Sequence, residues 1–151
     1  MYEKFGQFID GKWCQSSDKS TYEVINPANE ETLGHASKAT SEDVDRALKS
    51  AEKGLQVWKK TPPWKRSYII RRIADKIREK QDVLAKWMTL EVGKPFVEAK
   101  GEVNGAADIF EWNAEETKRI YGQTVESRFE DTRVHVYYQP VGVVAALSPW
   151  N

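Results

Sequence analysis

The chain has 151 residues and carries 23 basic and 23 acidic side chains, so its net charge is zero. Because proteins that bind nucleic acid usually have a basic excess or a basic face, this balance argues against that class of partner, and the pairs Lys65-Arg66 and Arg71-Arg72 are expected to face water. A single cysteine excludes an intrachain disulfide framework, and the N-terminus lacks the apolar core of a signal peptide. The longest apolar run, Val141–Leu147, is too short to cross a bilayer. Together these observations predict a soluble, cytoplasmic protein without a membrane partner.

The first 40 residues are predicted to form two β-hairpins. In the stretch "FIDGKW", the Asp10-Gly11 pair separates apolar and aromatic residues, which is a strong signal for a two-residue hairpin turn. A second hairpin is expected from strands at Tyr22–Ile25 and Thr32–Ala36, joined by a turn over Pro27–Glu30. The N-terminal part is therefore expected to be β structure.

From residue 40 onward the apolar residues recur with the period of a helix. Thr40 and Asp43 stand three positions apart, as in a capping box, and are predicted to open a helix that ends before Pro62-Pro63. The predicted buried face of this helix comprises Val44, Ala47, Leu48, Ala51, Leu55 and Trp58.

Three more helices are predicted to follow. The second runs from about Trp64 to Glu79, the third is capped by Asp82 and stops at Gly93, and the fourth and longest runs from about Phe96 to Ile120. The predicted buried faces comprise Ile70, Ile73, Ala74 and Ile77 in the second helix, Leu84, Trp87 and Met88 in the third, and Val103, Ala107, Phe110 and Ala114 in the fourth.

The last 30 residues again have the pattern of strands. The stretch "RVHVYY" alternates, which predicts a strand with two different faces over Arg133–Tyr138. Val141–Leu147 is continuously apolar, as in a strand covered on both faces in a parallel sheet, yet no comparable run occurs earlier to pair with it. We therefore expect a truncated piece of a larger protein. The composition is hydrophilic, with 30% charged residues and a mean hydropathy of −0.68. It fits that interpretation, and it also fits a helical protein with long solvated faces.

Common motifs for metal or phosphate chemistry are absent: the sequence contains no CxxC, HExxH, GxGxxG or GxxxxGK[ST]. No metal site is therefore predicted. His35 and His135 are expected to be structural or surface residues, and Cys14 a packing or surface thiol, because no base is near it in sequence. The carboxylate pairs expected to face solvent are Glu30-Glu31, Glu115-Glu116 and Glu130-Asp131.

The chain ends on "SPWN", directly after the predicted buried strand. In open α/β sheets, ligands bind outside the carboxyl ends of the strands, where Trp150 would offer a flat wall and the Asn151 amide a donor to an oxyanion, a contribution of roughly 3 kcal/mol in a dry site. By themselves the residues favour the structural alternative, a loop in which Trp150 packs and Asn151 forms a turn.

Several segments in the same order resemble the N-terminal part of the NAD(P)-dependent aldehyde dehydrogenases. They are "FIDGKW", "VINPANEE", "SEDVDRAL", residues 58–66, "TLEVGKP" with "EAKGEV", and "QPVGVVAALSPWN", of which the last is the most specific. Within the family, "MTLEVGKPFVEAKGEV" and "FEWNAEETKRIYGQT" are most similar to the succinate-semialdehyde dehydrogenases.

The resemblance implies an incomplete α/β fold, made of β-hairpins, four helices, arm strands and the first strand of a Rossmann-like sheet. Residues 1–120 would be the N-terminal part of the cofactor-binding domain, residues 121–139 an oligomerisation arm, and residues 140–151 the first Rossmann-like strand with the PWN loop. The family's arm implies a homo-oligomer, a dimer or a tetramer, when the protein is complete.

The family's chemistry begins with a cysteine thiolate that attacks the aldehyde carbon. A backbone N–H and the asparagine of the PWN motif hold the oxyanion, hydride passes to NAD or NADP, and a glutamate-activated water hydrolyses the thioester to release the carboxylate. Carried onto this sequence, Asn151 is the catalytic oxyanion donor. The residues that line the cofactor cleft in this resemblance are Ser148, Pro149 and Trp150.

The resemblance also places Gly101 and Gly105 on a helix face that borders the substrate tunnel, where their small size would leave room. The family's catalytic cysteine, its general-base glutamate and its cofactor-binding lysine and glutamate all lie beyond the PWN motif, and Cys14 stands in the wrong place to replace the nucleophile. This chain alone is therefore predicted to be inactive. The alternative is a non-catalytic fragment or interaction module that pairs through its arm strand.

Overall fold

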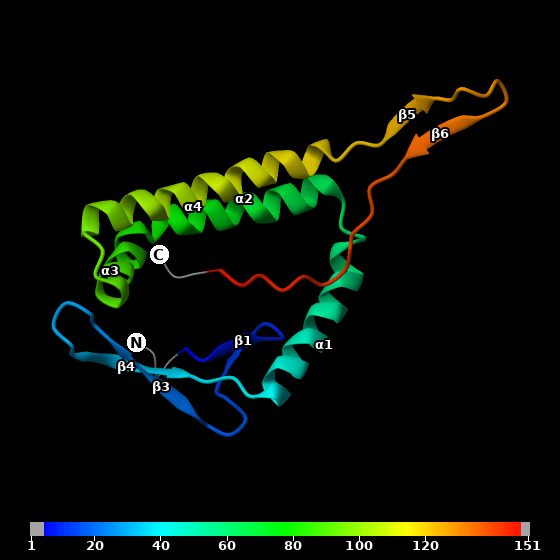
Figure 1. Ribbon diagram of the computed structural model, residues 1–151. Helices are drawn as coiled ribbons and strands as arrows, with labels where there is room; N and C mark the ends of the chain where they lie inside the picture. The colour runs from blue at the N-terminus through cyan, green and yellow to red at the C-terminus, as the bar shows by residue number, and fades with distance from the viewer. Residues whose placement is uncertain (1–4, 149–151) are drawn as a thin grey trace.

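The computed structural model describes residues 5–148 and begins with two antiparallel hairpins (Figure 1). The first joins β1 (Gln7–Ile9) to β2 (Lys12–Cys14), and the second joins β3 (Thr21–Ile25) to β4 (Thr32–Ser37). The turn of the first is the predicted Asp10-Gly11 pair, whose φ angles of 54° and 74° are those of a type I′ turn. Both predicted hairpins are confirmed.

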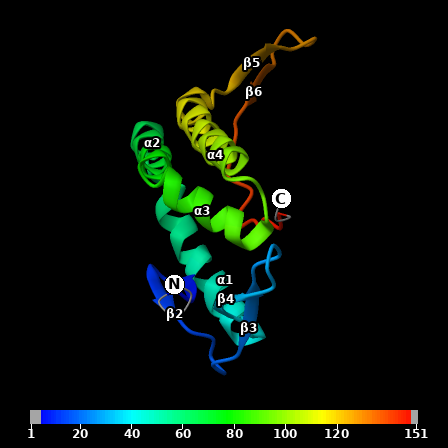
Figure 2. The ribbon, with the colours of Figure 1, turned by 90° about the vertical axis from the view of Figure 1, so that its left-hand side faces the viewer.

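Four α-helices follow, and α4 packs against both α2 and α3 (Figures 1 and 2). Their bounds are α1 (Ser41–Trp58), α2 (Pro63–Glu79), α3 (Gln81–Val92) and α4 (Phe96–Glu116), with a 3₁₀ turn, η2 (Thr117–Arg119), after α4. The fourth α-helix is thus shorter than predicted, because its last turn tightens into the 3₁₀ form before Ile120.

The predicted end of α3 is confirmed, and its predicted cap is wrong. Gly93 ends the helix in the left-handed conformation, with a φ of 77°. Lys80 occupies the N-cap position without a side-chain hydrogen bond, because α3 follows α2 with almost no intervening loop. Asp82 therefore lies inside the first turn, where it pairs with Lys100 of α4 at 2.7 Å.

The helical core consists almost entirely of small side chains. Ala85, Ala99 and Val103 form its centre, with Ile77 and Met88 partly buried against them. Small side chains at a contact let helix backbones approach closely, so α4 can lie along two helices at once. The other buried apolar residues are Ala74, Ala107 and Ala114.

Many of the larger apolar residues on the predicted faces are exposed. On α1, Val44 and Leu48 keep 49% and 47% of their surface accessible. The predicted burial is also wrong for Trp58, Ile73, Leu84 and Phe110. Periodicity identified an apolar stripe correctly, and within residues 5–148 no layer covers the stripe on α1, which contacts mainly the first hairpin.

A third hairpin projects away from the helices as an arm (Figures 1 and 2). It pairs β5 (Gln123–Glu126) with β6 (Arg133–Val136), and every residue of both strands is exposed. The predicted strand at Arg133–Tyr138 is confirmed over its first four residues.

The predicted buried strand at Val141–Leu147 does not form. After the arm, this segment turns back toward α3 as irregular extended chain (Figure 1), with Val141 and Leu147 at 93% and 98% exposure. A strand is defined by hydrogen bonds to a neighbour, and residues 5–148 contain no neighbouring strand for this segment. No described helix has both the length and the apolar character needed to cross a membrane.

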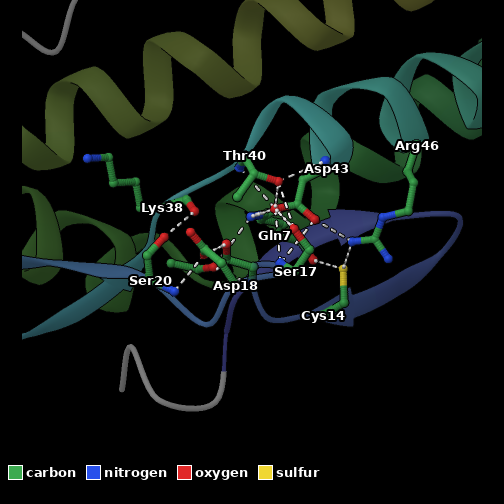
Figure 3. A network of polar contacts seen from close by, with 11 residues as sticks. Gln7, Cys14, Ser17, Asp18, Ser20, Lys38, Thr40, Asp43 and Arg46 are labelled. Atoms are coloured by element: carbon green, nitrogen blue, oxygen red, sulfur yellow. Dashed lines mark hydrogen bonds and ion pairs between the residues drawn. The ribbon is translucent and has the colours of Figure 1, made fainter.

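One buried carboxylate ties the N-terminal strands to α1 (Figure 3). Asp43 is only 1% exposed and accepts hydrogen bonds from the backbone N–H groups of Thr40 at 3.0 Å and Ser17 at 3.1 Å. Gln7 Nε2 donates at 3.3 Å, and Arg46 Nη2 pairs with the other oxygen at 2.7 Å. The Thr40 side chain accepts a hydrogen bond from the Asp43 N–H in return, so the predicted capping box is confirmed. Asp43 also accepts from residues before the helix, namely Ser17 and Gln7.

These donors, the Thr40 backbone N–H first among them, hold the pKa of Asp43 well below its ordinary value. A carboxyl whose pKa is lower in the folded state than in the unfolded chain stabilises the fold above its unfolded pKa of about 3.9. That contribution is lost as the pH falls from there toward the folded pKa.

The capping box predicts a measurable loss on Thr40→Ala. Removing the hydroxyl leaves the Asp43 N–H without its acceptor, so the free energy of unfolding should fall by about 1 kcal/mol in urea denaturation followed by circular dichroism. Ser41→Ala, an exposed neighbour in the first helical turn, is the matched control and should leave the midpoint unchanged. Equal effects of the two substitutions would contradict the role of the cap.

Candidate functional site

The long helix α4 turns an open face away from its packed side. Gly101 and Gly105 lie four residues apart on this face, and a Cβ placed on either would meet no atom within 4 Å. Val97, Ile109 and Trp112 flank them and are 81%, 65% and 69% exposed. The face is therefore shallow at its centre and accessible, with exposed apolar side chains beside the acidic Glu98 and Asp108, and another layer or a small molecule could contact it.

A ladder of ion pairs sets the position of α4 against α2. Arg71 pairs with Glu111 at 2.6 Å and Glu115 at 2.8 Å, while Arg78 pairs with Asp108 at 2.7 Å and the second oxygen of Glu111 at 2.6 Å. The expectation that Arg71 and Glu115 face only water is wrong, because the groove between the helices brings their charged ends together. The ladder holds α4 in a rotation that leaves its glycines outward.

The ladder lowers the pKa values of its carboxyl groups. Hydrogen bonds from Lys118 and then from Arg71 lower the pKa of Glu115 to about 2. The hydrogen bond from Arg78 is the main cause of the lowered pKa of Glu111. Both groups stabilise the packed helices in their charged form.

Sequence reasoning missed this ladder, although a spacing signal for it exists. Arg71 and Arg78 are seven residues apart, and Asp108, Glu111 and Glu115 follow at intervals of three and four, so each set falls on one helical face. Recognising the pairing requires knowing that the two helices are neighbours, which only the fold provides.

The predicted site residues fall on separate elements. Gly101 and Gly105 share the open face of α4, whereas Ser148 is exposed at the end of the extended segment that follows the arm. Pro149, Trp150 and Asn151 lie outside the described residues.

The other candidate side chains have local partners. His135 lies 3.3 Å from the Thr124 hydroxyl across the arm hairpin. The Cys14 thiol donates to the Gln7 carbonyl at 3.5 Å and has an Arg46 nitrogen 4.0 Å away. Within residues 5–148, no group of three or more acidic, histidine or cysteine side chains could hold a metal ion.

The arrangement of hairpins, helices, projecting arm and returning segment has close counterparts among known proteins. The sequence pattern of the aldehyde dehydrogenase family matches residues 13–151. The chain belongs to the aldehyde dehydrogenase family.

Among curated relatives, glutarate-semialdehyde dehydrogenase of Pseudomonas aeruginosa is 42% identical over 95% of this chain. The NADP⁺ succinate-semialdehyde dehydrogenase GabD of Escherichia coli is also 42% identical over 95% of the chain. The chain spans only 30% of the length of each of these relatives.

Solved structures agree with this membership. A crystal structure of an NADP-dependent enzyme from E. coli superposes with a TM-score of 0.93 at 41% identity, covering 98% of this chain and 31% of that one. Succinate-semialdehyde dehydrogenase from Burkholderia pseudomallei also gives 0.93, at 37% identity, covering 97% of this chain and 30% of that one. The hairpins, helices and arm are thus the N-terminal part of an aldehyde dehydrogenase fold.

The ion-pair ladder predicts an acid-dependent loss of stability. Glu111→Gln removes the carboxylate shared by both arginines and should lower the free energy of unfolding at pH 7. Because the folded pKa of Glu111 is lowered, the deficit relative to the original chain should shrink as the pH falls below about 4.3, where the unfolded carboxyl becomes protonated.

Urea denaturation across pH 7 to 2 measures this convergence. Asp75→Asn, at an exposed acid in the middle of α2 outside the ladder, serves as the control and should track the original chain at every pH. A deficit for Glu111→Gln that stayed constant across the acid range would contradict the charge-based role.

Proposed function

We propose that this chain is the N-terminal segment of an NAD(P)-dependent aldehyde dehydrogenase that oxidises succinate semialdehyde to the dicarboxylate. The observation that carries the proposal is a match, at 42% identity, to succinate- and glutarate-semialdehyde dehydrogenases over 95% of this chain. A 3-sulfolactaldehyde dehydrogenase of Pseudomonas putida matches less well, at 35% identity. All three substrates named for these relatives carry an acidic group at the end opposite the aldehyde, which supports a short, negatively charged aldehyde as the substrate class.

The role proposed for this chain in the reaction is to hold the oxyanion. The Asn151 side-chain amide would donate a hydrogen bond to the oxygen of the attacked aldehyde, and such a donor acts most strongly where water is excluded. The nucleophile must come from elsewhere, because Cys14, the chain's single cysteine, lies in β2 beside the Gln7 carbonyl and Arg46. We therefore propose that the 151-residue chain alone has no dehydrogenase activity.

The cofactor is proposed to be NAD or NADP, which supplies the hydride acceptor when bound. Ser148, Pro149 and Trp150 would form one wall of its cleft, and Ser148, the described member of this set, is exposed and accessible. Residues 5–148 offer no glycine-rich turn for the phosphates, so the described part of the chain fits one edge of a dinucleotide and no more. The relatives that support this cofactor class include GabD, which is named for NADP⁺, and a betaine aldehyde dehydrogenase of Staphylococcus aureus solved with NAD⁺.

The open face of α4 is proposed to border the path of the substrate. Gly101 and Gly105 leave room at the centre of the face, and exposed apolar side chains frame it.

The location of the protein in the cytoplasm stays a prediction from the sequence.

The arm is proposed to join copies of the protein into a homo-oligomer. Val125 and Val134 are paired across β5 and β6 and are 44% and 40% exposed. Unpaired strand edges with exposed apolar residues favour addition of a further strand. An arm that pairs without any catalytic role is the alternative function, and the two are separated by measuring activity and assembly independently.

Asn151→Ala tests the oxyanion role in the longer polypeptide that continues from this chain. The expected result is a loss of roughly 10²–10³ in kcat with succinate semialdehyde, with little change in KM, because the donor acts on charge that develops during the reaction. The rate at which NAD(P)H forms, followed by its absorbance, provides the measurement. Activity of the 151-residue chain by itself, or full activity of Asn151→Ala, would overturn the proposal.

Val134→Lys tests the arm. A charge in the middle of the proposed intermolecular sheet should shift the longer polypeptide toward smaller assemblies in size-exclusion chromatography with light scattering. Val83→Lys, at a valine on α3 that is 54% exposed, is the control and should keep the original assembly. An unchanged elution of Val134→Lys would place the subunit contact elsewhere.

A further inference from the structure

A cavity of about 420 Å³ lies where the end of α1, the start of α2 and the segment after the arm meet. This volume is in the range of small-molecule sites. Ten residues line it: Leu55, Trp58, Lys59, Arg66, Ile120, Tyr138, Gln139, Pro140, Val141 and Gly142. We call it the α1–α2 pocket.

The charge in the α1–α2 pocket is entirely positive. Lys59 and Arg66 are its two ionised side chains, and no acidic residue is among the lining residues. Arg66 thus differs from Arg71 and Arg78, the arginines of α2 that pair with carboxylates of α4. An anion that enters the pocket would meet two cations and no competing acid.

The Arg66 side chain has a donor without a partner. Its Nε is fully buried and has no hydrogen-bond partner among the described residues. A buried donor of a charged group that is left without a partner is costly, and native structures normally satisfy it. Because a fully buried atom is closed to a ligand as well, an anion in the pocket would meet the outer nitrogens of the guanidinium, which also have no hydrogen-bond partner among the described residues.

The remaining walls are apolar and partly aromatic. Trp58 and Ile120 are 38% and 57% exposed and contribute flat and aliphatic surface, and Tyr138 adds a second ring. The segment that carries Tyr138 includes Gly142, whose φ of 124° is rarely accessible to other residues. The conformation of this wall thus depends on a specific glycine.

We propose that the α1–α2 pocket binds a small aromatic carboxylate. The outer nitrogens of the Arg66 guanidinium offer N–H donors to the oxygens of a carboxylate, and Lys59 adds charge. The rings of Trp58 and Tyr138 accommodate a planar apolar body, which a compact inorganic anion would leave uncovered. The proposal is independent of aldehyde oxidation, because none of the residues assigned to that reaction lines the pocket.

Titration of the ¹⁵N-labelled chain with sodium benzoate tests the site by NMR. The Nε–H signal of Arg66 should shift and saturate, with a Kd on the order of 1 mM for so small a ligand. Sodium acetate, which has the charge without the ring, and benzyl alcohol, which has the ring without the charge, should each bind at least about tenfold more weakly. Failure of the Arg66 signal to shift, or equal binding of all three probes, would overturn the proposal.

Variants separate specific binding from general attraction to a basic surface. Arg66→Gln and, independently, Lys59→Gln at the exposed end of α1 should each weaken benzoate binding, Arg66→Gln by at least about tenfold. Arg72→Gln removes an exposed arginine of α2 outside the pocket and should leave the Kd unchanged. If Arg66→Gln does not fold, the Arg66 shift in the original chain and the Lys59→Gln titration decide the result. Equal weakening by Arg72→Gln would show that the probe responds only to net charge.

Discussion

The contact of α4 with α2 and α3 is the constraint on which the rest of the structure depends. Its centre is built from Ala85, Ala99 and Val103, so three helices approach closely with little side-chain volume between them. Such a small core leaves a narrow margin of hydrophobic stabilisation. The ladder of Arg71 and Arg78 with the acids of α4 joins partly exposed side chains, so it fixes the relative orientation of the helices more than it adds to their stability.

A second junction, at Asp43, ties the N-terminal hairpins to the helical part. The carboxylate caps α1 and at the same time receives the backbone of Ser17 and the side chain of Gln7, which come from before the helix. One buried acid thus satisfies donors from two layers, which explains why it is tolerated at 1% exposure. Charged groups with specific partners contribute to both contacts, whereas many of the large apolar residues remain on the outside.

That distribution of apolar surface is consistent with the place of the chain in the aldehyde dehydrogenase family. The chain spans about 30% of the relatives it matches. The exposed stripe of α1, the open face of α4 and the uncovered Val141–Leu147 segment are surfaces that more protein can cover. The arm adds strand edges for pairing between copies, while the α1–α2 pocket is a separate, positively charged hollow whose Arg66 donor lacks a partner among the described residues.

The sequence by itself determined the local structure and the family. The Asp10-Gly11 turn, the Thr40–Asp43 capping box and the Gly93 helix end follow from backbone preferences that act over a few residues, so they were predictable. Only the tertiary structure decided which apolar faces are covered, that Arg71 has partners, and that Val141–Leu147 forms no strand. The physical reason is that burial, ion pairing and strand formation each require a second element at the right distance, and periodicity in one segment carries no information about its neighbour.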